Sequence, residues 1–202
     1  MTSIPQGAVI TADIVGSQSL SQLQLTRLQS ELKNYLAEIA TAEQGYYSFY
    51  RGDGFQLVLP DATKLFNVAL QLRLFLISRH SDARLSLAVG EVNITAADLS
   101  TATGTALVLA GRGLDVIGQA RLKYNNDSNA HFALNLAFVD LLLSNLTQKQ
   151  AEAAFIHISH PKLSHADIAK QLNSSRVNVT KLLNSAHYTL LNQFLAIASS
   201  HQ

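Results

Sequence analysis

Cysteine and tryptophan are absent from this sequence of 202 residues, which contains one methionine and three prolines. Without cysteine, the chain forms no disulfide, no thiolate zinc site and no cysteine nucleophile. No stretch approaches the roughly 18 consecutive apolar residues that a membrane-spanning helix needs. The N-terminus also lacks the basic and apolar regions of a secretion signal. We therefore expect a cytoplasmic protein that does not interact with a membrane.

The residues that are present are typical of a globular protein, since 48% are hydrophobic and 14% are charged. Charges of both signs are balanced before residue 131, whereas residues 147–202 have a basic excess. Such a segment favours a polyanionic partner such as DNA, although a solvated helical surface looks the same. The excess consists of Lys149, Lys162, Lys170, Arg176 and Lys181 against Glu152 and Asp167.

The first half of the chain alternates between strand and helix patterns. An apolar run predicts a strand over residues 8–15, and apolar residues three and four apart predict a helix over residues 20–42. Two β-rich runs, residues 46–50 and 55–59, flank Arg51-Gly52-Asp53-Gly54, a sequence typical of a hairpin turn. A helix over residues 62–78 and a strand over residues 84–92 complete the βαββαβ order of ferredoxin-like folds.

The second half of the chain is predicted to be helical, which gives an α+β domain followed by an all-α domain. A helix is expected over residues 103–118, and polar residues 123–130 indicate the end of the first core. We assign residues 1–130 to the α/β domain, 131–146 to a connecting helix and 147–202 to a C-terminal helical domain. Capping boxes start two helices, at Thr147 with Gln150 and at Ser164 with Asp167, and a third helix is expected from residue 175 to about 198.

Two carboxylates are expected at one end of the predicted sheet. In a βαββαβ unit the first and third strands are antiparallel neighbours, so Asp13 near the end of one meets Asp53 at the start of the other. Two carboxylates repel each other unless a cation lies between them, and oxygen ligands suit Mg²⁺ or Mn²⁺. This pattern predicts a phosphate-carrying metal site. Alternatively, backbone amides or an arginine satisfy Asp13, and Asp53 is an ordinary turn residue.

These motifs resemble the class III nucleotidyl cyclases. TADIVGS at residues 11–17 and YRGDGFQLVL at residues 50–59 are similar to their two metal-binding motifs, and residues 104–114 are similar to a later helix motif. The resemblance implies metal binding by Asp13 and Asp53, a catalytic role for Arg112, and nucleoside triphosphate binding by Gly16, Ser17, Gly52 and Arg112. The chain departs from the cyclases at three positions, where Val108, Phe49 and Thr101 replace an asparagine, a base-reading lysine and a base-reading aspartate.

The order of motifs over nearly the whole chain resembles the SatD family of bacterial proteins. In that family two aspartate motifs and an A-x-R element precede a helix-turn-helix. The corresponding residues here are Asp13 in DIVGSQ, the run Gly52-Asp53-Gly54-Phe55-Gln56, and Ala110-Gly111-Arg112. Gly54 stands where the family usually has a glutamate. The resemblance implies a class III nucleotidyl cyclase-like domain and a helix-turn-helix in one chain.

Residues 164–183 fit a helix-turn-helix of DNA-binding type. Asn173 stands at the turn, where asparagine tolerates a left-handed conformation, and Ser174 or Ser175 caps the second helix. Arginine and asparagine in the first turn of that helix can read base edges, and lysine suits phosphate. The predicted DNA-binding residues are Ser175, Arg176, Asn178, Thr180 and Lys181. The buried positions are Ile168, Ala169, Leu172, Val179 and Leu182 or Leu183.

These observations predict a transcription regulator that binds double-stranded DNA and whose cyclase-like domain senses a nucleotide or a divalent metal. We expect a homodimer, because cyclase-like domains complete their site across a two-fold interface and paired helix-turn-helix units read a palindrome. One alternative is a metal-dependent enzyme acting on nucleoside triphosphates. Another is a homodimeric interaction module with a dead nucleotide site, in which the C-terminal helices are a bundle that packs against a partner.

Overall fold

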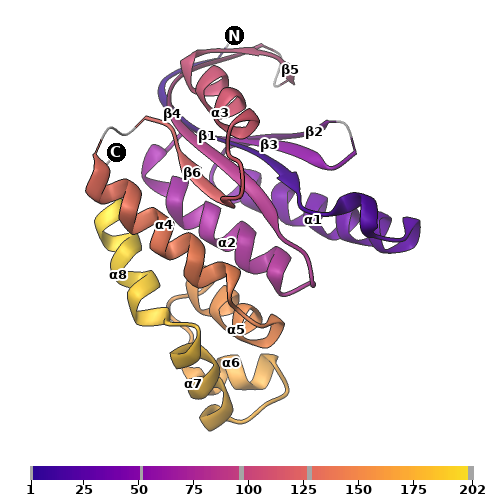
Figure 1. Ribbon diagram of the computed structural model, residues 1–202, viewed down its shortest axis with the longest axis vertical. Helices are drawn as coiled ribbons and strands as arrows, with labels where there is room; N and C mark the ends of the chain where they lie inside the picture. Colours follow the sequence, from indigo (N-terminus) through magenta and orange to yellow (C-terminus); the bar gives the residue numbers. More distant parts are fainter. Residues whose placement is uncertain (1, 51, 96–97, 127–128, 200–202) are drawn as a thin grey trace.

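The computed structural model describes residues 2–50, 52–95, 98–126 and 129–199 (Figure 1). Arg51 of the predicted turn lies outside the described residues. No helix in these ranges is long and apolar enough to cross a membrane.

The described residues form a six-stranded sheet in the N-terminal part of the chain. The strand order is β2-β3-β1-β4-β5, and β6 pairs with β4 in parallel. Because β1 pairs with both β3 and β4 in antiparallel orientation, the predicted βαββαβ order is confirmed. The strands are β1 (Thr2–Ile14), β2 (Tyr46–Tyr50), β3 (Gly54–Leu59), β4 (Ala83–Thr95), β5 (Asp98–Thr103) and β6 (Leu122–Tyr124).

Helices cover both faces of the sheet. Alternate side chains of β1 point to opposite faces of the sheet. Ala8 and Ile10 therefore belong to the core between the sheet and helices α1 and α2, whereas Val9 packs with Ala106 and Ala110 of α3. Figure 1 shows α6 and α7 at the end of the molecule far from the N-terminus. The helices are α1 (Gln22–Ala42), α2 (Leu65–Ile77), α3 (Thr105–Asp115), α4 (Ala130–Ser144), α5 (Gln148–Ser159), α6 (His165–Gln171), α7 (Arg176–Ser185) and α8 (Tyr188–Ala198).

Three elements differ from the sequence prediction. Strand β5 was not predicted, and β6 includes two of the residues interpreted as a polar break. Strand β6 is held by its pairing with β4, from Leu85 opposite Leu122 to Leu87 opposite Tyr124. The prediction of one helix from residue 175 to 198 was wrong, because the left-handed conformation of His187, at φ 52°, separates α7 from α8.

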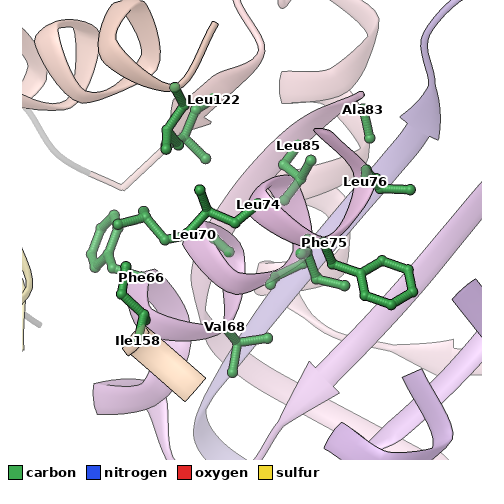
Figure 2. Close-up of a cluster of buried hydrophobic side chains, with 14 of the residues drawn as sticks. Phe66, Val68, Leu70, Leu74, Phe75, Leu76, Ala83, Leu85, Leu122 and Ile158 are labelled. Carbon is green, nitrogen blue, oxygen red and sulfur yellow. The ribbon is translucent and has the colours of Figure 1, made fainter. Parts of the chain in front are cut away.

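The core is continuous from the sheet to the C-terminal helices. Helix α2 is apolar on nearly all sides, as expected of a helix that is buried between layers (Figure 2). The ring of Phe66 in α2 contacts Phe132 of α4 and Phe194 of α8 edge-on, with centroids 5.2 and 5.8 Å apart. The C-terminal helices therefore fold against α2.

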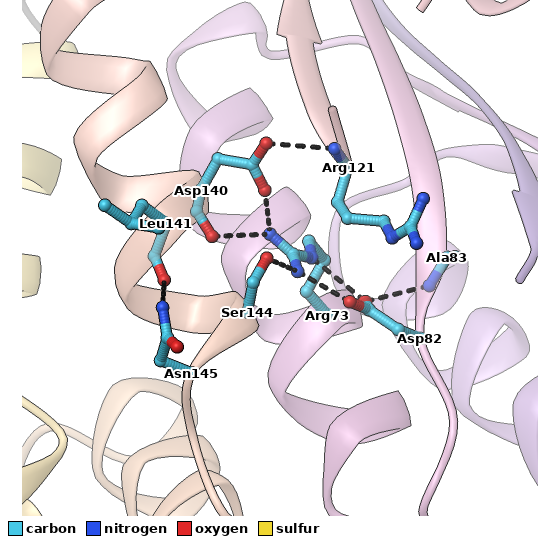
Figure 3. Close-up of polar contacts among 8 residues, drawn as sticks. All are labelled: Arg73, Asp82, Ala83, Arg121, Asp140, Leu141, Ser144 and Asn145. Carbon is cyan, nitrogen blue, oxygen red and sulfur yellow. Dashed lines mark hydrogen bonds and ion pairs between the residues drawn. The ribbon is translucent and has the colours of Figure 1, made fainter. Parts of the chain in front are cut away.

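A buried arginine fastens the connecting helix α4 to the sheet layer (Figure 3). Arg73 of α2 is fully buried and forms ion pairs with Asp82, at 2.6 Å, and with Asp140 of α4, at 2.5 Å. Its Nη2 also donates to the hydroxyl of Ser144, and Asp140 accepts from the backbone N–H of Arg121. The guanidinium is thus satisfied by α4 and by the residue that precedes β4.

Candidate functional site

The register of the sheet places Asp13 and Asp53 at the same end, as the strand order predicts. Asp13 lies opposite Gly54 of β3 on one side and Arg84 of β4 on the other. The backbone N–H of Ile14 donates to the carbonyl of Asp53 at 3.0 Å, which holds the turn before β3 against the end of β1. Asp13 is an even number of residues from Val9, so its side chain belongs to the face of the sheet that α3 covers.

Both carboxylates have partners within the chain. The Nε of Arg84 donates to Asp13 Oδ1 at 2.9 Å, and its Nη2 donates to Asp13 Oδ2, so the pair is bidentate. The hydroxyl of Ser17 donates to Asp53 Oδ2 at 2.6 Å. The hydrogen bonds to Asp13, and the charges of Asp13 and Asp53, raise the pKa of Arg84 although partial burial opposes the shift. Of the two alternatives for Asp13, the structure shows satisfaction by an arginine.

A row of polar side chains continues across the strands from the carboxylates. Thr11 of β1 lies opposite Gln56 of β3 and Ser86 of β4. The Gln56 amide donates to the Thr11 hydroxyl at 3.0 Å, and the Asn125 amide donates to the Ser86 hydroxyl at 2.9 Å. These contacts satisfy the buried polar groups of this face.

The predicted nucleotide-binding residues of the turns gather at the same sheet end. Gly16 follows β1 in the left-handed conformation, at φ 66°, and precedes a 3₁₀ turn, Ser17–Ser19. Ser17 is buried and bonded to Asp53 as described above. Gly52, at φ 82°, forms the neighbouring turn, and its carbonyl accepts from the side chain of Gln29 in α1.

Arg112 comes from α3, on the same face as Asp13. The next residue, Gly113, lies so close to the polar row that an added Cβ would be 2.4 Å from Ser86 Oγ. The C-terminal end of α3 therefore lies against this row. Within the described ranges Arg112 is exposed and has no ion-pair partner, which leaves its guanidinium available to an anion. Its catalytic role stays a prediction.

Arg84 is the site residue that the sequence analysis missed. It stands at the start of an alternating strand pattern, where an exposed arginine is ordinary. The signal that could have identified it is the register, because in this antiparallel pairing residue 84 lies directly opposite Asp13.

The residues present do not fit a divalent metal ion in this arrangement. A hard cation needs free carboxylate oxygens, and both oxygens of Asp13 accept from Arg84, while one oxygen of Asp53 accepts from Ser17. In the part of the chain that the structure describes, no three or more histidine, aspartate or glutamate side chains are grouped to hold a metal.

Helices α6 and α7 have the local features predicted for a helix-turn-helix. Asn173 adopts the left-handed conformation, at φ 47°, and the N–H of Ser174 donates to the carbonyl of Ala169 at 2.8 Å. The predicted capping box of α6 is present, and the hydroxyl of Ser175 caps α7 by accepting from the N–H of Asn178. The core between the helices contains the predicted residues, with Ile168, Ala169, Val179 and Leu183 buried and Leu172 and Leu182 half-buried.

Three of the four side chains predicted on the exposed side of α7 are exposed. Arg176, Asn178 and Lys181 are exposed, and neither cation has an ion-pair partner among the described residues. The Asn178 amide donates to the Ser174 hydroxyl at 2.9 Å. Thr180 differs from the expectation because it is half-buried: its hydroxyl donates to the carbonyl of Arg176 and contacts His165 of α6.

Two further features of this helical region were not predicted. Val177, in the first turn of α7, is 65% exposed, and an apolar side chain there can contact a thymine methyl group. His157 of α5 packs edge-on against Tyr188, with ring centroids 5.1 Å apart, and near His165 at 6.2 Å. Burial, and then the charge of His165, lower the pKa of His157 below its ordinary value.

No family model and no curated protein matches the chain. Among solved structures, a non-canonical dimeric guanylyl cyclase domain of the RhoGC fusion protein from Blastocladiella emersonii is 18% identical and covers 57% of this chain and 76% of its own, with a TM-score of 0.47. The guanylate cyclase domain of RhGC from Catenaria anguillulae, in complex with GTP, is 18% identical over 57% and 75%, with a TM-score of 0.46. The adenylyl cyclase CyaB from P. aeruginosa is 17% identical over 57% and 74%, with a TM-score of 0.44. At these values the likeness does not identify the chain as a cyclase.

Proposed function

We propose that this protein is a DNA-binding transcription regulator in which α6 and α7 are a helix-turn-helix and the sheet domain binds a nucleotide. The observation that carries the proposal is the start of α7, where a left-handed Asn173 turns the chain and Arg176 lies exposed, with no ion-pair partner in the part of the chain that the structure describes. A helix entering the major groove contacts base edges through its N-terminal residues.

The side chains of α7 divide into two roles. Arg176 and Asn178 belong to the first turn, where a guanidinium suits guanine and an amide suits adenine. Lys181 lies one to two turns further along the same helix and suits the phosphate backbone. Ser175 caps the helix and Thr180 faces α6, so both position the reading residues rather than contact bases.

The proposal includes a homodimer, because two copies of α7 related by a two-fold axis would read a palindromic site. It also includes a nucleotide ligand at the sheet end formed by Gly16, Ser17 and Gly52, with the exposed Arg112 on the adjoining helix. The shared core around α2 and the Arg73 ion pairs would transmit a change at the sheet to the C-terminal helices. A metal-dependent enzyme would instead require Asp13 to be free of Arg84.

The DNA-binding proposal is tested by selecting sequences from random duplexes and then titrating variants at two salt concentrations. Arg176→Ala should cost about 1–3 kcal/mol on the selected sequence and little on random duplex. Lys181→Ala should weaken both and reduce the salt slope by about one unit, because one phosphate contact is lost. Lys64→Ala is the matched control, since Lys64 is an exposed lysine of the sheet domain.

Failure to enrich any sequence would contradict the proposal, especially if both α7 variants bind DNA as the unmodified protein does. The C-terminal helices would then be a bundle that packs against a protein partner. Light scattering at micromolar concentration tests the dimer separately, because a monomeric protein could still bind a half-site.

A further inference from the structure

One guanidinium binds the first of the two carboxylates at the sheet end and is influenced by the charge of the second. Arg84 binds Asp13 through two parallel hydrogen bonds, and the charge of Asp53 also acts on it. Within the described residues Asp13 has no other ion-pair partner. The repulsion between two carboxylates at one sheet end is therefore offset by a cation that belongs to the chain itself.

The pairing of β1 with β4 fixes the position of Arg84. Its strand register puts it directly across from Asp13, and the side chains of the pair are only 38% and 24% exposed. On the other side of Asp13, Gly54 has no side chain, and the ring of Tyr50 packs so closely over it that an added Cβ would be 2.6 Å from the ring. Of the two strand neighbours of Asp13, Arg84 is therefore the one whose side chain can reach it.

A divalent ion would have to displace this arrangement. It would need to break a bidentate, charge-assisted pair, which is among the stronger polar contacts in proteins. It would then share the site with a guanidinium whose positive charge repels it, and cation affinity depends on the number of charged ligands. With Arg84 present the three groups sum to one negative charge, and without it to two.

We propose that Arg84 takes the place of the metal ion, so that the site is stable without Mg²⁺ or Mn²⁺ and a phosphate-bearing ligand meets an arginine there instead of a metal. The inference concerns the nucleotide site of the proposed function, and it is independent of DNA binding by α7. The site still retains both carboxylates, so removing the guanidinium alone should convert it into a cation site.

The experiment compares the full-length protein with Arg84→Gln, using Mn²⁺ as the probe in calorimetric titration and thermal unfolding. We expect the unmodified protein to show no saturable binding at about 1 mM Mn²⁺, and Arg84→Gln to bind at least about tenfold more tightly. Without metal Arg84→Gln should unfold at a lower temperature, and Mn²⁺ should restore it. Adding Asp13→Asn to this variant should abolish the metal effect.

Arg84→Lys is the second variant, since it keeps a positive charge and lacks the two-pronged geometry. Its affinity for Mn²⁺ should lie between those of the other two proteins, and it guards against a folding defect in Arg84→Gln. Saturable Mn²⁺ binding by the unmodified protein, as tight as that of Arg84→Gln, would overturn the inference. Folded Arg84 variants that bind no Mn²⁺ would also overturn it, whereas the outcome of the DNA selection would not affect it.

Discussion

Replacing Arg73 by methionine should test whether the buried ion pairs hold the connecting helix to the sheet. Methionine keeps most of the volume of the side chain, so the change removes charge and hydrogen bonds and creates little cavity. Five donor contacts to Asp82, Asp140 and Ser144 would be lost. The two carboxylates would remain without their cation in a mostly buried position.

The expected loss follows from burial. Removing one partner of a buried ion pair costs about 3–5 kcal/mol, because the remaining charge is left uncompensated. The side chains of Asp82 and Asp140 are 20% and 13% exposed, so water recovers part of this cost and the lower figure applies. A loss of about 3 kcal/mol corresponds to a fall in Tm of roughly 6–12 °C for a chain of this size.

Urea unfolding followed by circular dichroism measures the change, with Arg27→Met as the control. Arg27 is 82% exposed and pairs with Glu31 one turn away, so its replacement should cost less than about 0.5 kcal/mol. Combining Arg73→Met with Asp82→Asn and Asp140→Asn should recover part of the loss, since no charge is then left unpaired. If Arg73→Met costs less than about 1 kcal/mol, the reasoning from burial is refuted.

Two further predictions concern the C-terminal helices. The pKa of His157 is lower in the folded protein than in the unfolded chain, where it has its ordinary value of about 6.5. The unfolded chain therefore takes up the proton first as the pH drops through about 6.5, and the free energy of unfolding should fall there. His157→Phe keeps the ring and should reduce this loss between pH of about 7.5 and 5.5 in urea titrations; an unchanged pH dependence would exclude His157 as its source. Asn173→Val should destabilise the protein by about 1–2 kcal/mol, because a β-branched residue is strained at φ 47°, and Asn173→Gly should be tolerated; equal stability of both variants would contradict the turn geometry.

The helix N-termini and the order of strands and helices could be predicted from the sequence because their signals are local. The capping boxes at Thr147 and Ser164 are both present, since a serine or threonine and a side chain three residues later satisfy each other within one turn. Hydrophobic periodicity likewise predicted the βαββαβ order, and the hairpin sequence located β2 and β3 to within one residue. The break between α7 and α8 at His187 could not be predicted in this way, because a histidine gives no local signal for the end of a helix.

The candidate site shows where local signals end. The sequence by itself determined that Asp13 lies near the end of an apolar strand and that Asp53 lies in a hairpin turn. The strand order was enough to bring them to one sheet end. Only the tertiary structure decided that Arg84 is the cation that binds Asp13. The register between β1 and β4 sets this partner, which lies some seventy residues away in the sequence. The role of Arg73 could not be predicted for the same reason. Its partners Asp82 and Asp140 come from other parts of the chain, and hydrophobic periodicity does not show how those parts pack against α2.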